Sequence, residues 1–394
     1  MKLQLRLPIR SAVSRNVFMF ALAITAGLLS SCKKDDLATV DPPVIKPPVT
    51  QPMGTIPTDL PVMFVPGDNP VTAARVELGR HLFYDENMSV PTRGDSIRGT
   101  TSCGSCHDAA RGFSDKVAFS VGFNHKQGSR NAPGLTNVAY NTFFTWDGKF
   151  KTLEAHVPGP MFSPVEMGNN FANSPKDTVP SGYESDHGGN DTTLLFERII
   201  QAHKAEYTTL LVNAYGDAKF SLDRIVKAIA TFERTMISTE SPFDAFNKGD
   251  KIAISASAQR GFDLFRDSSK ANCISCHSGY NFTDGQFHNN GLVPNDVDQG
   301  QFKVSKKPED RFKFKVPTLR NVALSAPYMH DGRFAKLEQV IAHYNSGGSS
   351  ATVHDANVRK LNLSDQDIQD IVAFLNTLSD SKFASNANFS NPWK

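Results

Sequence analysis

Two short motifs constrain this chain of 394 residues more than any other feature. Both are C-x-x-C-H pentapeptides, and their fixed residues are Cys103, Cys106 and His107 in the first and Cys273, Cys276 and His277 in the second. In such a motif the two thiols form thioether bonds to the vinyl groups of a porphyrin, and the imidazole binds the iron from below. The two intervening residues make one turn, which brings both sulfurs to the same porphyrin edge.

The cysteine usage supports a cofactor role for both pairs. Paired cysteines also bind zinc, but structural zinc sites usually gather their ligands from one short stretch, whereas these pairs lie far apart. Four of the five cysteines belong to the motifs and the fifth is Cys32, so no pair remains for a disulfide. We therefore predict two covalently bound c-type haems as the cofactors.

The N-terminus is typical of an exported protein with a lipid anchor. A basic start is followed by the apolar segment 17–29 and by small residues directly before Cys32. The apolar run is shorter than the about 20 residues that a membrane-spanning helix needs. We predict a signal peptide over 1–31 with a lipobox, lipidation of Cys32, and a location on the periplasmic side of the membrane or at the cell surface, as an outer-membrane lipoprotein. The alternative is an ordinary export signal followed by an incidental cysteine.

The remaining sequence favours a mostly α, loop-rich protein with two cytochrome c-like haem domains packed against each other. Residues 32–66 are proline-rich, which predicts an extended linker. Apolar residues recur at helical spacing in six stretches, 73–83, 194–213, 222–236, 258–265, 337–344 and 364–378. We expect an N-terminal haem domain over 67–240 and a C-terminal haem domain over 241–394. A net charge of +2 gives no reason to expect a nucleic-acid partner.

A series of further motifs resembles the bacterial di-haem cytochrome c peroxidase and MauG family over residues 70 to 380. The motifs are Leu78-Gly79-Arg80, Arg130-Asn131-Ala132-Pro133, Trp146-Asp147-Gly148, Glu166-Met167, Val316-Pro317-Thr318-Leu319-Arg320-Asn321-Val322 and Ala326-Pro327-Tyr328-Met329-His330-Asp331-Gly332. The resemblance implies an oxidoreductase that reduces hydrogen peroxide at the N-terminal haem, with electrons relayed through the C-terminal haem.

The resemblance also implies roles for individual residues. Peroxide would react at the haem held by His107, while the haem held by His277 stores and relays electrons. Trp146 matches a tryptophan between the two haems, although a buried aromatic in the core would look the same. Glu166 matches a distal glutamate that moves the peroxide proton, since cleavage of the O–O bond needs both a base and an acid. His156 lies where classical members carry a glutamine, and either an acid–base or a hydrogen-bonding role is open to it.

Iron ligation departs from the classical pattern at two places. The position of a histidine that caps the N-terminal iron in classical members falls on Phe123, with His125 two residues away. We therefore favour an open iron, with a cap by His125 as the alternative. The position of a methionine ligand to the second iron falls on Tyr344, as it does in MauG, and Met329 and His343 are its rivals.

The resemblance extends to a second metal and to partners. Asn131 and the backbone carbonyls of Ser325 and Pro327 match a calcium site, and oxygen donors suit such a hard cation. The implied electron donor is a small redox protein, either a cytochrome c or a cupredoxin, and a homodimer is one option for the assembly. A MauG-like oxidase of a protein or small-molecule substrate is the alternative enzyme. From other classes, a non-catalytic di-haem electron-transfer cytochrome and a haem-based sensor stay open.

Overall fold

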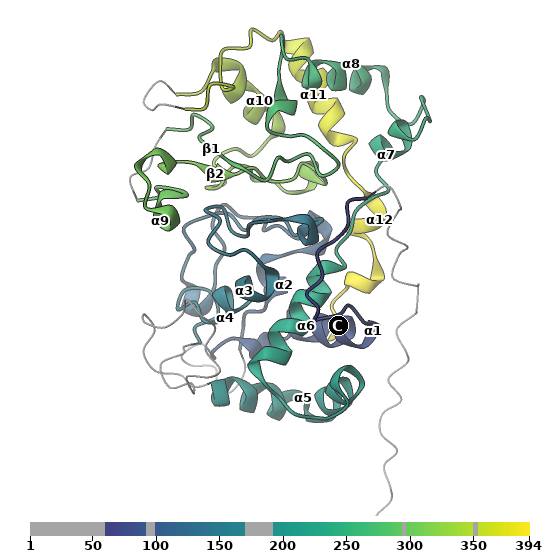
Figure 1. The fold of residues 1–394 in the computed structure, drawn as a ribbon, viewed down its shortest axis with the longest axis vertical. Helices are drawn as coiled ribbons and strands as arrows, with labels where there is room; N and C mark the ends of the chain where they lie inside the picture. The colour runs from purple at the N-terminus through teal and green to yellow at the C-terminus, as the bar shows by residue number, and fades with distance from the viewer. Residues whose placement is uncertain (1–59, 92–98, 170–191, 294–296, 350–353) are drawn as a thin grey trace, which may run out of the picture. The chain divides into compact units, whose positions relative to one another are not determined.

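The computed structural model describes residues 60–91, 99–169, 192–293, 297–349 and 354–394, with side chains from residue 195 in the third range (Figure 1). The predicted signal peptide, the lipid-anchor residue Cys32 and residues 33–59 of the predicted linker lie outside the described residues.

The described chain is mostly helical, which confirms the predicted fold class. The helices are α1 (Ala73–Tyr84), α2 (Cys103–Cys106), α3 (Leu153–His156), α4 (Pro158–Met161), α5 (Thr192–Tyr215), α6 (Leu222–Arg234), α7 (Pro242–Asn247), α8 (Ala256–Arg266), α9 (Phe302–Ser305), α10 (Leu337–Ser346), α11 (Asp365–Asn376) and α12 (Ser381–Ala384). Short 3-10 helices cover Glu86–Met88, Ala109–Arg111, Phe123–His125, Val138–Tyr140, Cys273–Ser275, Pro308–Asp310, Val322–Leu324 and Ala387–Phe389.

Two very short strands form the sheet that the described residues contain. Strand β1 (Phe287–His288) pairs in antiparallel fashion with β2 (Phe314–Lys315), so that Phe287 lies opposite Lys315 and His288 lies opposite Phe314. Cross-strand neighbours share one face of a sheet, and successive residues alternate between the faces. Phe314 and Lys315 therefore leave the sheet on opposite faces.

The buried apolar side chains form two cores. The first gathers residues from α1, α5 and α6, and the second gathers residues from α7, α8, α10 and α11. We call residues 60–240 together with 380–394 the N-lobe, and residues 241–379 the C-lobe. Each lobe carries one C-x-x-C-H motif.

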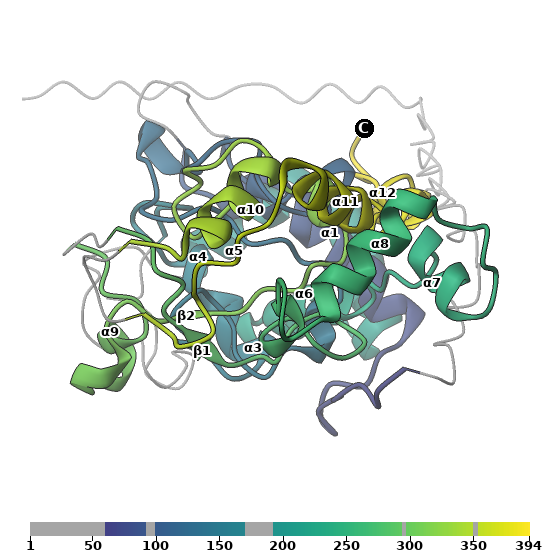
Figure 2. The ribbon, with the colours of Figure 1, turned by 90° about the horizontal axis from the view of Figure 1, so that it is seen from above.

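A helix crossing at a glycine organises each lobe. In the N-lobe α1 packs on α6, and a Cβ added to Gly79 would lie 1.9 Å from the carbonyl oxygen of Ala228. In the C-lobe α8 packs on α11 (Figures 1 and 2), and a Cβ added to Gly261 would lie 1.8 Å from the carbonyl oxygen of Asp370. Glycine is therefore required at both crossings, because any side chain would push the helices apart.

The C-terminal tail returns to the N-lobe, a detail that the sequence prediction does not contain. Phe383 and Phe389 lie in the core built around α1 and α6. The indole Nε1 of Trp393 donates a hydrogen bond of 3.0 Å to the carbonyl of His81, and its ring stacks on His203 at 4.0 Å. Residues 380–394 thus belong physically to the lobe that begins the described chain.

Candidate active site at the two cysteine–histidine motifs

The first motif is shaped by a single helical turn. Helix α2 covers Cys103–Cys106, and the backbone N–H of Ser102 is satisfied by the Ser105 hydroxyl at 3.0 Å. His107 follows the helix, and its Nδ1 lies 2.7 Å from the carbonyl oxygen of Phe113. A carbonyl can only accept, so Nδ1 carries the proton and Nε2 keeps a free lone pair. Burial also lowers the pKa of His107, which maintains the neutral form that binds iron.

A cavity of about 700 Å³ lies against this motif. Its wall contains both thiols of the motif and the His107 imidazole, and neither cysteine is in a disulfide. Side chains of both lobes complete the wall, with Trp146 from the N-lobe and Tyr328 from the C-lobe among them. Two free thiols, an imidazole with one open nitrogen and an enclosed space beside them fit a covalently held haem.

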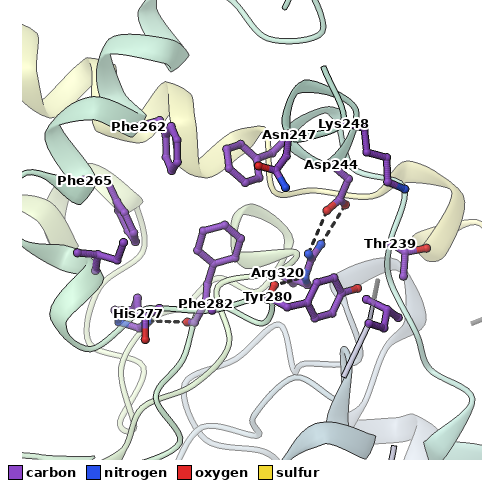
Figure 3. Close-up of a pocket in the computed structure, with 15 residues that line it drawn as sticks. Thr239, Asp244, Asn247, Lys248, Phe262, Phe265, His277, Tyr280, Phe282 and Arg320 are labelled. Carbon is purple, nitrogen blue, oxygen red and sulfur yellow. Dashed lines mark hydrogen bonds and ion pairs between the residues drawn. The ribbon is translucent and has the colours of Figure 1, made fainter. Parts of the chain in front are cut away.

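The second motif repeats the same device in the C-lobe. The turn Cys273–Ser275 precedes His277, whose Nδ1 donates to the carbonyl of Phe282 at 2.9 Å (Figure 3). Burial lowers the pKa of His277 as well. A pocket of about 250 Å³ beside it is lined by phenylalanine rings, including Phe262 and Phe265. The donor set again fits a covalent haem.

A buried ion pair fixes the floor of the C-lobe pocket. The guanidinium of Arg320 donates two hydrogen bonds of 3.0 Å to Asp244 and one of 2.9 Å to the carbonyl of Tyr280 (Figure 3). The Arg320 side chain is only 2 % exposed. Asp244 and Arg320 therefore neutralise each other, and Arg320 of the Val316–Val322 motif has a structural role at this position.

The two predicted acid–base residues both line the N-lobe cavity together with His107. The His156 ring lies between Phe144 and Phe150, at 6.0 and 5.6 Å between ring centres. Burial, and to a lesser degree the charge of His107, lower the pKa of His156 to about 4. His156 is consequently a neutral imidazole near pH 7.

Glu166 lies on a loop that is held by its backbone. Its N–H donates to the Ser163 hydroxyl at 3.2 Å, and its carbonyl accepts from the N–H of Phe123 at 2.6 Å. The side chain is exposed and lines the cavity, and desolvation at the cavity wall raises its pKa, while Lys149 opposes the shift. A carboxyl with a raised pKa is suited to carry a proton to and from a substrate oxygen.

Trp146 lies at the junction of the two lobes. Its indole Nε1 donates to the carbonyl of Asn131 at 2.8 Å, and its own carbonyl accepts from the N–H of Lys315 at 2.8 Å. The ring meets His330 edge-on at 6.5 Å, and His330 stacks on Phe314 at 3.7 Å. A continuous series of rings therefore runs from the N-lobe cavity into the C-lobe.

The candidate ligands of the second iron converge on Asn290. Burial raises the pKa of Tyr344 to about 12, with smaller contributions from the charges of Cys276 and Cys273 and an opposing hydrogen bond from Asn290. Asn290 also donates to the Met329 sulfur at 3.6 Å, and its carbonyl accepts from Nε2 of His343 at 2.9 Å. Met329 lines the N-lobe cavity. Tyr344 is thus the rival that lies in the electrostatic range of the C-lobe thiols.

The residues considered for capping the first iron lie elsewhere. His125 is exposed, and it is not part of the wall of the N-lobe cavity. The Phe123 ring packs so closely on Gly168 that a Cβ there would lie 2.6 Å from it. The structure therefore does not bring His125 together with His107, Glu166 and His156.

Comparison with known proteins agrees with this arrangement. The family model of the di-haem cytochrome c peroxidases matches residues 73–252, and the cytochrome c model matches residues 258–379. The methylamine utilization protein MauG of Methylorubrum extorquens is 35% identical over 317 residues, which cover 79% of this chain and 80% of that protein. The chain belongs to the di-haem cytochrome c peroxidase family. It is accordingly an oxidoreductase that carries two c-type haems.

Other relatives include a cytochrome c peroxidase and a MauG-like protein. Cytochrome c551 peroxidase of Pseudomonas aeruginosa is 31% identical over 319 residues, which cover 79% of this chain and 80% of that protein. The crystal structure of a MauG-like protein associated with microbial copper homeostasis superposes with a TM-score of 0.75 at 30% identity, covering 86% of this chain and 99% of that chain. Within the part of the chain that the structure describes, no helix is long and apolar enough to span a membrane.

The residues proposed for calcium belong to the wall of one cavity. Asn131, Ser325 and Pro327 all line the N-lobe cavity. The Asn131 amide donates to the carbonyl of Val117 at 2.9 Å, and its N–H donates to the carbonyl of His330 at 2.7 Å. The amide orientation leaves the side-chain oxygen as the available metal donor.

Sequence reasoning missed the ion pair that joins the lobes of this peroxidase-family chain. Arg130 donates to both carboxylate oxygens of Asp298 at 2.7 and 2.6 Å and to Asp147 at 2.7 Å. Arg130 stands in a quoted family motif, but its partner Asp298 stands in a loop of the other lobe with no motif around it. Pairing between such distant residues leaves no local signal in a single sequence.

Proposed function

We propose that the protein reduces hydrogen peroxide in the N-lobe cavity with electrons that enter through the C-lobe. The observation that carries this proposal is that Glu166, His156 and His107 line one cavity. When bound, the haem on His107 supplies the iron at which the O–O bond is cleaved, and the haem on His277 supplies electrons. The protein residues orient the peroxide and handle its protons.

Glu166 is the proposed proton carrier. Its carboxylate takes the proton from the oxygen of peroxide nearer the iron, and the resulting acid donates it to the departing outer oxygen. Desolvation at the cavity wall raises the pKa of Glu166, so that both protonation states are accessible nearer to neutral pH than for a carboxyl in bulk water. His156 stays neutral and acts as a hydrogen-bonding partner for the bound peroxide, because its pKa is lowered to about 4 by burial.

Trp146 is the proposed stepping stone for electrons. The hydrogen bond to Asn131 fixes its indole, and the edge-on contact with His330 continues into the C-lobe through Phe314. A fixed ring between two redox centres shortens the distance of each electron transfer. The external donor is proposed to be a small redox protein, a cytochrome c or a cupredoxin.

The ligation of the two irons favours a MauG-like variant of this activity. We assign Tyr344 as the second protein ligand of the C-lobe iron, because its phenol lies within electrostatic range of Cys273 and Cys276, whereas Met329 lines the N-lobe cavity. The exposed position of His125 supports an N-lobe iron that is open to peroxide at rest. Oxidation of a protein or small-molecule substrate is therefore the second candidate function.

Two further assignments complete the proposal. A calcium ion held by Asn131 and the carbonyls of Ser325 and Pro327 would stabilise the junction of the lobes, and chelation followed by calcium addition tests it. Export through the signal at 1–31 with lipidation at Cys32 would place the protein at a membrane surface facing the periplasm or the medium. A Cys32→Ser variant should then leave the membrane fraction.

The main proposal is tested by adding stoichiometric hydrogen peroxide to the oxidised, haem-loaded protein without a reductant. A rapid change of the optical and EPR spectra supports an open peroxide site and the MauG-like ligation. A change that requires prior one-electron reduction supports a peroxidase whose iron is capped at rest. No change under either condition, with no turnover of a chemical electron donor, would identify a non-catalytic electron-transfer cytochrome.

A further inference from the structure

Lys315 is a residue of the C-lobe that forms part of the N-lobe cavity. It is the second residue of β2, and it lines the same cavity as His107 and the two thiols of the first motif. Neither the ligation nor the proton transfer described above uses it. Its position follows from the way in which the small sheet contacts the N-lobe.

The pleat of the sheet turns Lys315 towards the N-lobe. Phe287, the cross-strand neighbour of Lys315, packs so tightly on Gly148 of the N-lobe that a Cβ there would lie 2.2 Å from its ring. Phe314 lies on the other face, stacked on His330. Because cross-strand neighbours share a face, the Lys315 side chain leaves the sheet on the side of Phe287. The backbone N–H of Lys315 donates to the Trp146 carbonyl at 2.8 Å, and this hydrogen bond fixes the register.

No carboxylate among the described residues pairs with the Lys315 ammonium, although other lysines nearby have partners. Lys313, two residues earlier, lies 3.1 Å from Asp310, and Lys303 lies 3.8 Å from Asp298. Lys315 is half-buried in the cavity wall, and desolvation there lowers its pKa to about 8. A partly desolvated cation without a counter-ion is costly, so this position favours an anion beside it.

The carboxylates of the cavity wall do not supply this anion. Asp147 is bonded to Arg130 at 2.7 Å. Glu166 is influenced by Lys149, and burial raises the pKa of Glu233 to about 8, with Arg234 as its opposing charge. The anion must therefore arrive with the molecule that fills the cavity. A haem carries two propionate carboxylates on the edge opposite to its thioether bonds.

We propose that Lys315 is the counter-ion of a propionate of the haem bound in the N-lobe, so that a side chain of one lobe holds the cofactor of the other. This inference rests on the assignment of a haem to the N-lobe cavity but not on peroxide chemistry. A fixed cation beside the propionate favours the reduced haem, because reduction removes one positive charge from the iron. The same residue bonds Trp146 through its backbone, so haem position and electron route are coupled at one strand.

The test compares haem-loaded wild type with Lys315→Met, in which the stem is kept and the charge is lost. We expect the reduction potential of the N-lobe haem, measured by spectroelectrochemical titration, to move to a more negative value. The resonance Raman band of the propionate groups should shift in the same variant. Lys315→Arg should restore both signals, and the matched control Lys313→Met should leave both at their wild-type values.

Unchanged potential and Raman signals in a Lys315→Met protein with full haem content would overturn the assignment. Lys315→Gln covers the case in which the methionine variant does not load haem, since it keeps a polar end and lacks only the charge. Both readouts are taken without peroxide. A protein that fails to turn over peroxide but shows the Raman shift would therefore contradict the proposed function and leave the role of Lys315 intact.

Discussion

The two lobes carry the same haem-attachment motif in nearly the same local structure. In each, a helix crossing at a glycine precedes a turn of two cysteines, and the following histidine donates Nδ1–H to a phenylalanine carbonyl. Both of these phenylalanines have a positive φ, 60° at Phe113 and 50° at Phe282. The two motifs therefore share one local geometry, and the groups that surround each motif distinguish the two lobes.

The surroundings differ in how their charges are paired. The C-lobe pocket is aromatic, and its Asp244 and Arg320 neutralise each other. The N-lobe cavity instead holds Glu166 and Lys315 without a carboxylate–cation pair between them among the described residues. Paired charges keep a redox centre in a constant environment, whereas unpaired titratable groups can exchange protons or bind a charged ligand. This contrast assigns electron storage to one lobe and substrate chemistry to the other.

The largest expected effect on stability comes from breaking the paired charges of the C-lobe. Asp244→Asn leaves the Arg320 guanidinium buried with a neutral partner, and we expect a loss of about 3–5 kcal/mol in the free energy of unfolding. Urea unfolding of the haem-loaded protein measures it. Asp263→Asn, which removes the partner of Arg266 where both side chains are more than half exposed, is the control and should cost less than about 1 kcal/mol. Equal losses in the two variants would contradict the contrast.

The corresponding change in the N-lobe should affect catalysis instead of stability. Glu166→Gln keeps the shape of the side chain but removes the proton carrier, and we expect a fall of about 100-fold in kcat/KM for peroxide, or about 2.7 kcal/mol. Steady-state oxidation of a chemical electron donor measures it. Glu240→Gln, on an exposed pair with Lys382, is the matched control. If the stability of Glu166→Gln fell as far as that of Asp244→Asn, the loss of activity would have to be assigned to unfolding.

The helix crossings allow the two lobes to be weakened one at a time. A side chain at Gly79 or at Gly261 meets a backbone oxygen within 2 Å, so Gly79→Ala and Gly261→Ala should each cost about 1–3 kcal/mol. Hydrogen exchange resolved by peptide should show faster exchange in α1 and α6 for the first variant and in α8 and α11 for the second. Gly67→Ala, with no atom within 4 Å of the added Cβ, is the control. Faster exchange in both lobes from either variant would mean that they unfold together.

The sequence predicted those parts of the fold that depend on neighbouring residues. The apolar spacing over 364–378 and the N-cap Ser364 correspond to α11, where the Ser364 hydroxyl accepts from the N–H of Asp367 at 3.2 Å. The cysteine spacing likewise specified both haem turns. The sequence does not predict elements that depend on distant partners. Strands β1 and β2 are only two residues long, and the tail that carries Phe389 packs on a lobe formed by the start of the described chain.

The same limit applies to the site. Glu166 and His156 were placed through the family resemblance, because a single glutamate or histidine has no local pattern of its own. Lys315 was not identified, since its role depends on the face of a two-residue strand and on the absence of a carboxylate partner among the described residues. Two residues are too few for a periodic pattern, so the role of Lys315 can be recognised only once the cavity that it lines is known.

The smallest expected effect is a pH dependence confined to the C-lobe. His288 lies between two carboxylates, with Nδ1 at 2.5 Å from Asp355 and Nε2 at 2.8 Å from Asp284. Donor atoms of Cys276, Asp284 and His288, one from each, lie within 4.8 Å of one another. Burial lowers the pKa of His288, but the two carboxylates outweigh it and the net shift is upward from 6.5. The folded protein thus binds this proton more tightly than the unfolded chain. The stabilisation is complete below pH 6.5 and is lost as the pH rises through the raised value.

His288→Gln should therefore be less stable than wild type by up to about 1 kcal/mol in mildly acidic solution, and equally stable in alkaline solution. Urea unfolding at the two pH values measures the difference, and added salt should reduce it because half-exposed ion pairs are screened. A gap that widened with rising pH would show that the imidazole stabilises the site in its neutral form. In that case the assignment of a charged His288 between Asp284 and Asp355 would be wrong. His288 would then resemble the neutral His156 of the N-lobe, and one difference between the lobes would disappear.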